Sequence, residues 1–175
     1  MSGVIFITDY NPDWPALFDR EAARIRTALG RLTLGVEHVG STSVPGLAAK
    51  PIIDILLVVE DSADEDAYKS TLEMAGYILN RRERDWYQHR LFKGSDPVVN
   101  LHVFSSGCPE IQRMIQFRDW LRCNPADRDL YAATKLALAR NKWKSVQAYA
   151  DAKTPIVVEI LARATAGSAN SKVSS

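Results

Sequence analysis

The sequence has few cysteines and no long apolar run. Its 175 residues include two cysteines, Cys108 and Cys123, whose spacing matches no metal-binding motif. This disfavours a disulfide scaffold or a zinc finger, and we expect both thiols to remain reduced. No apolar stretch approaches the roughly 20 residues that a membrane-spanning helix needs. The N-terminal MSGVIFITDY also lacks the basic start and long apolar segment of a secretion signal, so we expect a cytoplasmic protein without a membrane partner.

The sequence also lacks an excess of charge of either sign. Its 22 lysines and arginines are balanced by 21 acidic residues, for a net charge of +1. Proteins that attract nucleic acid through their overall field are strongly basic, so no such partner is expected. A site for an anion must therefore be built locally from a few side chains. The sequence carries no signal for an oligomeric state.

What the sequence contains is the pattern of one mixed domain. An apolar content of 46% over 175 residues is enough for one hydrophobic core. We assign that domain to residues 1–163 and expect the small, polar residues 164–175 to form a flexible tail. Helical patterns dominate after Pro109. The predicted strands are Leu34–Val39, Ile52–Val59, Trp86–Phe92 and Pro97–Phe104.

The segment Ile52–Val59 predicts a strand covered on both faces, because its apolar residues run without alternation. Asp54 interrupts this run. Burying an ionised carboxylate there costs on the order of several kcal/mol unless a cation or hydrogen-bond donors meet it. We therefore expect Asp54 to face a ligand or a metal ion. The alternative is a structural aspartate that accepts hydrogen bonds from backbone amides of a neighbouring turn.

A turn of small residues, GSTS, ends the strand predicted just upstream. Such a turn exposes successive backbone N–H groups and forms a concave site for an anion, with hydroxyl groups beside it. Gly40, Ser41 and Ser43 are therefore candidate phosphate-binding residues. Asp54 follows Ser41 by thirteen residues, on the next predicted strand. The turn and the carboxylate could thus lie within the length of one ligand.

Three histidines are candidates for chemistry. Alternation along the strand Pro97–Phe104 places Asn100 and His102 on one face. His102 is a candidate catalytic and metal-binding residue, although a lone strand histidine can also be a hydrogen-bonded structural group. His38 lies on the strand that enters the turn and could converge on the same place as a metal ligand. His89 is assigned to a hairpin face.

Two arginines lie on the apolar side of the helix that is expected after Pro109. At 100° per residue, Arg118 and Arg122 fall within the same arc as its apolar residues. Guanidinium groups in that position should meet an anionic ligand or buried carboxylates. Phosphate binding is the functional interpretation, and a salt bridge to Asp54 or another acid is the structural one.

Two Tyr-x-x-x-Lys pairs occur in the predicted C-terminal helices. Tyr131 with Lys135, and Tyr149 with Lys153, are each separated by one helical turn. On the first helix we expect Leu130 to point inward and this pair to lie at the edge. Both pairs could border one cleft, where Lys135 and Lys153 would neutralise a phosphate.

A charged segment, NRRERD, occupies residues 80–85 after a strand that is expected to begin at Tyr77. Charge runs of this kind usually form solvated loops, and that is the structure we predict here. A loop that grips a phosphate is the alternative.

Several of these residues together resemble one protein family. Gly40-Ser41 followed by Lys50-Pro51-Ile52-Ile53-Asp54-Ile55 is similar to the GrpB family, and Lys50 joins the phosphate-binding candidates on this basis. The resemblance runs from about Ile5 to Leu161 and includes LHV at 101–103, FRDWLR at 117–122 and both Tyr-x-x-x-Lys pairs. It implies the polymerase-beta-like nucleotidyltransferase fold. The expected class is α+β, with a nucleotidyltransferase-like mixed β-sheet, helices packed on it and a helical C-terminal segment.

The superfamily resemblance also implies a carboxylate pattern from which this sequence departs. Active members carry two carboxylates one residue apart on the strand after Gly-Ser, and a third on a later strand, which together hold two divalent ions. Here Asp54 fills the first position and Leu56 occupies the second. Asn100 and His102 stand where the third carboxylate is expected.

Three functions follow as hypotheses. The first is a protein that binds a nucleotide or another phosphorylated small molecule and transfers a nucleotidyl or phosphoryl group, with a divalent metal, Mg²⁺ or Mn²⁺, at Asp54 and His102. The second is a non-catalytic binding or regulatory module. The third is a metal-dependent hydrolase in which His38, Asp54 and His102 bind Zn²⁺ or Mn²⁺.

Overall fold

A five-stranded mixed sheet forms the centre of the computed structural model, which describes residues 5–173, with side chains to residue 167. The strands run in the order β1-β2-β5-β4-β3. β2 and β5 are parallel, and the other neighbours are antiparallel. The predicted α+β class with a mixed sheet is confirmed. The strand bounds are Gly35–Val39 (β1), Ile53–Val59 (β2), Ile78–Glu83 (β3), His89–Ser95 (β4) and Val98–Ser105 (β5).

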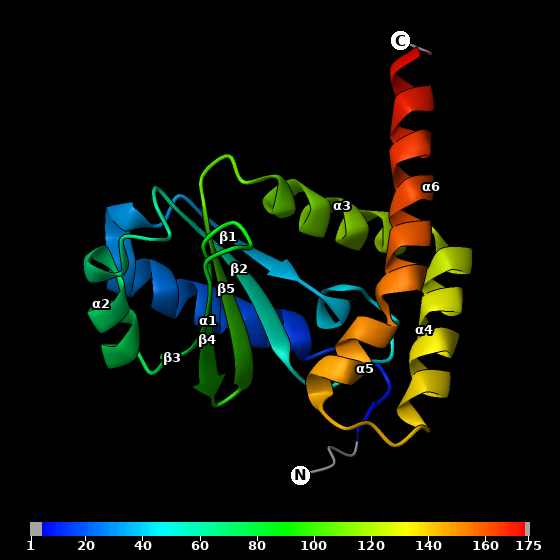
Figure 1. Ribbon diagram of the computed structural model, residues 1–175, viewed down its shortest axis with the longest axis horizontal. Helices are drawn as coiled ribbons and strands as arrows, with labels where there is room; N and C mark the ends of the chain where they lie inside the picture. The colour runs from blue at the N-terminus through cyan, green and yellow to red at the C-terminus, as the bar shows by residue number, and fades with distance from the viewer. Residues whose placement is uncertain (1–4, 174–175) are drawn as a thin grey trace.

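Six α-helices and three short 3-10 turns surround the described part of this sheet. Figure 1 shows α3 to α6 gathered beside β1 and β2, whereas α2 lies at the far end near β3. The helical C-terminal segment is therefore confirmed. The bounds are Trp14–Leu29 (α1), Lys69–Met74 (α2), Pro109–Cys123 (α3), Pro125–Ala139 (α4), Val146–Ala152 (α5), Thr154–Val173 (α6), Gly30–Leu32 (η1), Ser41–Ser43 (η2) and Glu65–Ala67 (η3).

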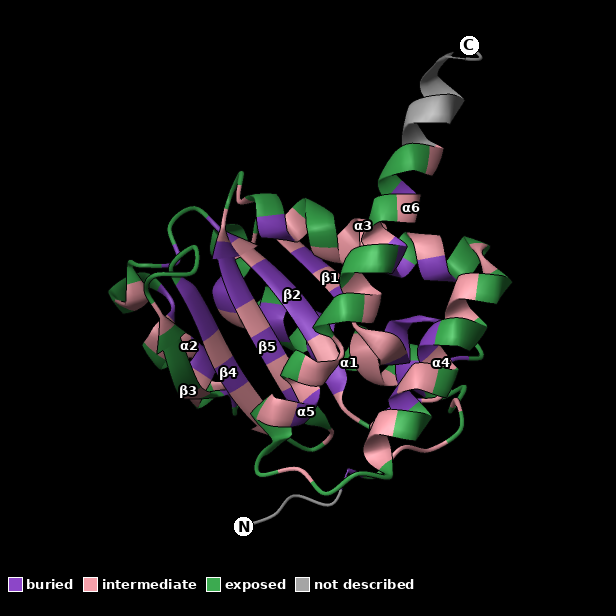
Figure 2. Ribbon diagram, turned by 45° about the vertical axis from the view of Figure 1, so that its right-hand side comes forward, coloured by how far each residue is buried: buried purple, intermediate pink, exposed green. Residues whose placement is uncertain are grey.

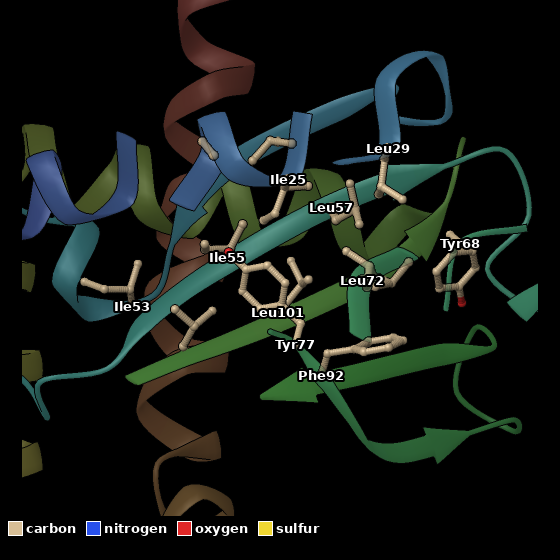
Figure 3. Close-up of a cluster of buried hydrophobic side chains, with 14 of the residues drawn as sticks. Ile25, Leu29, Ile53, Ile55, Leu57, Tyr68, Leu72, Tyr77, Phe92 and Leu101 are labelled. Atoms are coloured by element: carbon tan, nitrogen blue, oxygen red, sulfur yellow. The ribbon is translucent and has the colours of Figure 1, made fainter. Parts of the chain in front are cut away.

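The larger core lies between one face of the sheet and helices α1 and α2. From β2 it takes Ile53, Ile55 and Leu57, which alternate onto this face and are at most 1% exposed. Ile25 of α1 and Leu72 of α2 close over them, as Figure 3 shows. Burial of aliphatic side chains at about 25 cal/mol per Å² makes this face the main source of stability.

The other face of the sheet carries a smaller apolar cluster under α3. Val39, Leu56 and Phe104 are buried there against partly buried residues of that helix. Toward the beginnings of β2 and β5 this face becomes polar, and Asp54 and Asn100 pair across the two strands. Helix α5 lies near those strand ends, as Figure 2 shows. The inner strand β2 therefore supplies both a core and a polar surface.

The inward face of α4 differs from the prediction. Tyr131 and Lys135 are buried, at 5% and 3% exposed, whereas Leu130 is 42% exposed. The expectation that Leu130 points inward and that the Tyr/Lys pair lies at the edge was wrong. The helix turns this pair inward because Tyr131 packs in a cluster with Leu121 of α3, which joins α3, α4 and α6.

Two expectations about segments also change. Residues 80–83 belong to the edge strand β3 and not to a loop, because Arg81, Arg82 and Glu83 pair with β4. Helix α6 continues through Val173, and Ala164 is fully buried, so packed structure crosses the predicted boundary at residue 163. The flexibility of the tail stays a prediction, and Ser174 and Ser175 lie outside the described residues. Cys108 and Cys123 are free thiols. Within residues 5–173 no helix combines the length and apolar character that crossing a membrane requires.

The first prediction concerns Leu56, the residue at the expected position of a second carboxylate. Its side chain is completely buried between the sheet and α3. Leu56→Ala should lower the free energy of unfolding by about 2–5 kcal/mol, because it removes buried methyl groups and leaves a cavity. Urea denaturation measures this change. Leu136→Ala is the control, since Leu136 is 43% exposed on α4 and its truncation should change stability little. Equal stabilities of the two variants would contradict this account.

Candidate functional site

Gly40 allows the turn after β1 to approach Asp54 closely. The last residue of β1, Val39, pairs with Asp54 of β2, so the turn begins beside the carboxylate. Gly40 has φ +70°, and a Cβ built on it would lie 2.9 Å from the Cβ of Asp54 and closer still to a carboxylate oxygen. Any other residue would collide with Asp54 and would also be strained at this φ. The glycine of the motif is therefore required by both backbone conformation and space.

The hydroxyl groups of this turn have different roles. Ser43 Oγ donates to the Gly40 carbonyl at 2.5 Å, and Thr42 Oγ1 donates to the Ile52 carbonyl at 3.1 Å. These two hydroxyls shape the turn from within. Ser41 Oγ instead accepts a hydrogen bond from Lys135 Nζ at 2.9 Å, and Ser41 lines a cleft. The structure thus brings Ser41, but not the Ser43 side chain, to the surface that a ligand could reach.

Asp54 is held by side chains and not by the amides of a turn. Asn100 Nδ2 donates to its Oδ1 at 2.7 Å, and Lys93 donates to Oδ1 of Asn100. His102 Nε2 lies 3.6 Å from Oδ1 of Asp54. Burial would raise the pKa of Asp54, but His102, Asn100 and the Lys153 charge outweigh it and hold the pKa below its ordinary value. An ionised carboxylate therefore faces the site.

A row of hydrogen bonds leads from Asp54 across the sheet. His102 Nδ1 lies 3.1 Å from His89 Nε2, and His89 Nδ1 lies 2.7 Å from Glu83 Oε2. Burial, and then the proximity of His102, lower the pKa of His89 to about 4. His89 is therefore neutral at neutral pH, and it donates from Nδ1 to the carboxylate.

A cleft of about 870 Å³ opens between this polar face and helices α4 and α5. This volume is within the range of about 300–1,000 Å³ that is typical of small-molecule sites. Asp54 and Glu83 are the two carboxylates among the described residues that line it, and they face five cationic side chains. Those cations are Lys50, Arg81, Lys93, Lys135 and Lys153.

Four of these cations are lysines whose ammonium groups are disfavoured by burial. Burial, and then the Lys153 charge, lower the pKa of Lys135 to about 7, although Asp54 opposes this. Burial is also the first cause of a lowered pKa at Lys50, Lys93 and Lys153. Lysines that lie this close to one another are strained when charged, and an anion between them would relieve the strain.

Tyrosine rings support three of the lysines. The Tyr149 ring lies 5.1 Å from Lys50 Nζ and 5.0 Å from Lys153 Nζ, and Lys135 Nζ lies 4.8 Å from the Tyr131 ring. Such contacts stabilise a cation by about 0.5–2 kcal/mol, depending on its desolvation. Lys135, Tyr149 and Lys153 line the same cleft, whereas Tyr131 contacts Lys135 without being part of the lining.

A second, smaller cavity of about 230 Å³ lies on the same face of the sheet, under α3 and α6. Asp54 and His102 line both spaces. The remaining wall is largely apolar, with one ion pair between Glu110 and Arg113 at 2.9 Å. The two site residues therefore separate a cationic cleft from an apolar cavity.

Arg118 and Arg122 are bound to protein groups outside the cleft. Arg118 Nη1 donates to Glu37 at 2.7 Å and to the His38 carbonyl at 3.0 Å, and Arg122 donates twice to the Ser43 carbonyl. Neither arginine lines either cavity. The structure does not bring them to the predicted phosphate site. Helix α3 packs on β1, so both arginines are bound to groups of β1 and of the turn that follows it. Arg118 forms a salt bridge to Glu37, which is the structural alternative that was predicted for it.

The three residues proposed as metal ligands are not assembled. His38 pairs with Ile55 in the sheet, so it points to the α1 face, opposite to Asp54. There it stacks on Phe18 and contacts Thr42 Oγ1 at 3.0 Å, and burial lowers its pKa to about 4. In the part of the chain that the structure describes, no three His, Cys, Asp or Glu residues converge on one point. Asp54 and His102 alone offer two ligands, and a divalent metal stays a prediction.

Sequence reasoning missed Arg81, Glu83 and Lys93 as site residues. The charged segment was expected to be a loop, but its strand geometry directs Arg81 and Glu83 into the cleft. Lys93 was missed because the predicted strand ended at Phe92, whereas β4 continues to Ser95 and pairs Lys93 with Asn100. Lys50, Lys135 and Lys153 were predicted and do line the cleft.

Comparisons with known proteins agree with this architecture. The family model described as GrpB protein matches residues 4–163. The UPF0157 protein BH1888 of Halalkalibacterium halodurans is 63% identical over 162 residues, which cover 93% of this chain and 83% of that protein. The crystal structure of conserved protein GrpB from Enterococcus faecalis is 34% identical, with a TM-score of 0.80 over 91% of this chain and 96% of that chain.

A structure of the Cid1 poly(U) polymerase, with Mg and 3'-dATP bound, matches less closely. It is 11% identical, with a TM-score of 0.45 over 73% of this chain and 44% of that chain. This partial likeness carries no argument about activity. The match to the family model and the high identity to relatives establish descent. The chain belongs to the GrpB family.

Proposed function

We propose that this protein binds a nucleotide or another phosphorylated small molecule in the cationic cleft. The observation that supports this best is the convergence of five cations on one space, in a chain whose overall charge is near zero. A local excess of this kind is expected for a polyanionic ligand and not for a neutral one. Ser41 and Lys135, which are already hydrogen-bonded to each other, would contact its phosphate groups.

Transfer of a nucleotidyl or phosphoryl group is the reaction that we propose for this site. Asp54 and His102 lie at the edge of the cleft, where they could orient a reacting hydroxyl. Lys50, Lys135 and Lys153 would neutralise the charge that develops on the leaving phosphate. In phosphoryl transfer, positioning and electrostatic stabilisation of this kind provide most of the catalysis.

A non-catalytic binding module is the second candidate, and Leu56 favours it. This residue is completely buried in the cluster under α3, so the strand offers one carboxylate and not two. A protein that kept the phosphate site without a second metal ligand could bind and not react. Turnover by the wild type that is lost in Asp54→Asn, with folding retained, would exclude this candidate.

Removal of one cleft lysine should weaken nucleotide binding. Lys153→Met is expected to raise the dissociation constant of ATP about tenfold, because it removes a charge-assisted contact. Isothermal titration calorimetry measures this change. Lys144→Met is the matched control, since Lys144 is exposed and does not line the cleft. Absence of saturable binding of ATP, ADP and pyrophosphate to the wild type would contradict the proposed function.

Nucleotide binding should also depend on the charge of Lys135. With a pKa lowered to about 7, this lysine is protonated below pH 7 and neutral above it. The ratio of wild-type to Lys135→Met affinity for ATP should therefore be about tenfold at pH 6 and should approach unity by pH 9. Using this ratio cancels the titration of ATP itself. A ratio that stays constant over this range would show that Lys135 does not act through its charge.

The charge of Asp54 allows a test for a metal ion. Without divalent cations, Asp54→Asn should bind ATP more tightly than the wild type, because a carboxylate repels phosphate groups. With Mg²⁺ or Mn²⁺, the wild type should gain affinity and the variant should not, since a carboxylate is a preferred ligand of these ions. Asp129→Asn, at an exposed position, is the control. Identical affinities under all these conditions would exclude Asp54 from the site.

A further inference from the structure

The cleft has two ends of different chemistry. Ser41 and Lys135 lie beside the beginning of β2, whereas Arg81 and Glu83 come from the edge strand β3. Strands β5 and β4 separate β2 from β3. At about 4.8 Å between neighbouring strands, the two ends of the cleft floor are about 14 Å apart. This distance suits an elongated ligand that carries its phosphates at one end and a different group at the other.

The end at β3 presents a guanidinium group beside a carboxylate. Arg81 and Glu83 are two residues apart on one strand, so they share a face, and Nη1 lies 3.5 Å from Oε1. Arg81 also donates to Gln147 Oε1 at 3.1 Å, and Glu83 Oε2 lies 2.7 Å from His89 Nδ1. A guanidinium has five N–H donors, and a carboxylate has about four positions for accepting. Within residues 5–173 the pair therefore still offers donors beside acceptors to the cleft.

Guanine is the nucleobase that matches such a pair completely. Its edge carries two adjacent acceptors, N7 and O6, followed by two adjacent donors, N1–H and the N2 amino group. The acceptors fit the fork of a guanidinium, and the donors fit the two oxygens of a carboxylate. Adenine, cytosine and uracil each present one donor group on the corresponding edge, so one carboxylate oxygen would stay without a partner from the base.

Trp86 adds an aromatic surface to the same end of the cleft. Its backbone N–H donates to the Glu83 carbonyl at 3.2 Å, and its own carbonyl accepts from the His89 N–H at 3.0 Å. Tyr87 and Gln88 between them both have φ +52°, as the central residues of a tight type I′ turn do. The indole packs edge-to-face on His89 at 4.9 Å, and the residue is 39% exposed and lines the cleft. An indole held in this way is a surface on which a base can stack.

We propose that the β3 end of the cleft is a guanine subsite, so that the ligand of the proposed function is a guanosine phosphate. Arg81 donates to N7 and O6, Glu83 accepts from N1–H and the N2 amino group, and the base stacks on Trp86. The phosphates extend from there toward Ser41 and Lys135. This inference rests on the proposed function, because it names the base of the same ligand.

Three nucleotides that differ only in the base test this subsite in the wild type. GTP, ITP and ATP are titrated by isothermal calorimetry at one fixed Mg²⁺ concentration. ITP lacks the N2 amino group, so it should bind about tenfold more weakly than GTP, which is the contribution of one hydrogen bond to a carboxylate. ATP should also bind at least about tenfold more weakly than GTP, since its edge offers one donor group. Equal affinities of GTP and ITP, or of GTP and ATP, would overturn the proposal.

A conservative variant assigns the discrimination to Glu83. Glu83→Gln keeps the size of the side chain and replaces one acceptor oxygen with a donor. The ratio of GTP to ITP affinity should therefore fall from about tenfold to near unity. Because both nucleotides are measured on one protein, this ratio cancels any effect of the variant on folding or on phosphate binding. Glu73→Gln makes the same change on α2, outside the cleft, and should keep the wild-type ratio. An unchanged ratio in Glu83→Gln would overturn the proposal.

A second matched pair of variants tests the stacking surface. Trp86→Leu should weaken GTP binding about tenfold and leave pyrophosphate binding unchanged, because the indole contacts the base alone. Tyr87→Leu is the control, since Tyr87 is 49% exposed and is not part of the cleft lining. Circular dichroism checks that both variants fold. Equal binding of GTP by folded Trp86→Leu and the wild type would overturn the proposal.

The same titrations separate this inference from the proposed function. If ATP and pyrophosphate bind but GTP has no advantage over ATP and ITP, only the guanine subsite fails. If neither pyrophosphate nor any of the three nucleotides binds saturably, the proposed function fails with it. Tighter binding of GTP that depends on Glu83 and Trp86 supports both.

Discussion

Placement of one carboxylate between four lysines is the constraint on which the site depends. Lys50, Lys93, Lys135 and Lys153 all have a lowered pKa, and burial is the first cause for each. Asp54 is the group that opposes this shift at every one of them. Its carboxylate is held in turn by Asn100 and by the glycine turn, which leaves no room for a side chain. The fold thus keeps a concentrated positive charge that a single acid only partly offsets.

The sheet can carry this charged site because its two faces differ in polarity. One face is apolar along its length and packs on α1 and α2, which provides stability. The other face is apolar only under α3 and becomes polar where β2 and β5 begin. Parallel pairing of these two strands brings Asp54 and Asn100 side by side, although they are far apart in the sequence. A polar site can be exposed there without weakening the main core.

Family membership and electrostatics give complementary information about this chain. The GrpB match and the relatives establish descent and architecture. The cleft supplies the evidence for a ligand class, because its charge differs so strongly from that of the whole chain. Arg118 and Arg122 show why position matters more than residue type. They have the right chemistry for phosphate, but Arg118 holds α3 to Glu37 of β1, and Arg122 holds it to the Ser43 carbonyl of the turn.

The sequence by itself determined the segments of β1, β2 and β5, the shared face of Asn100 and His102, and the close relation of the Gly40 turn to Asp54. These follow from local periodicity and turn chemistry, which act over a few residues. Only the tertiary structure decided that Lys135 points inward, that His38 lies on the opposite face, and that residues 81–83 pair with β4 as part of a strand. Periodicity gives the spacing of side chains along an element. Which face is turned inward depends on the elements that pack against it, and these come from distant parts of the chain.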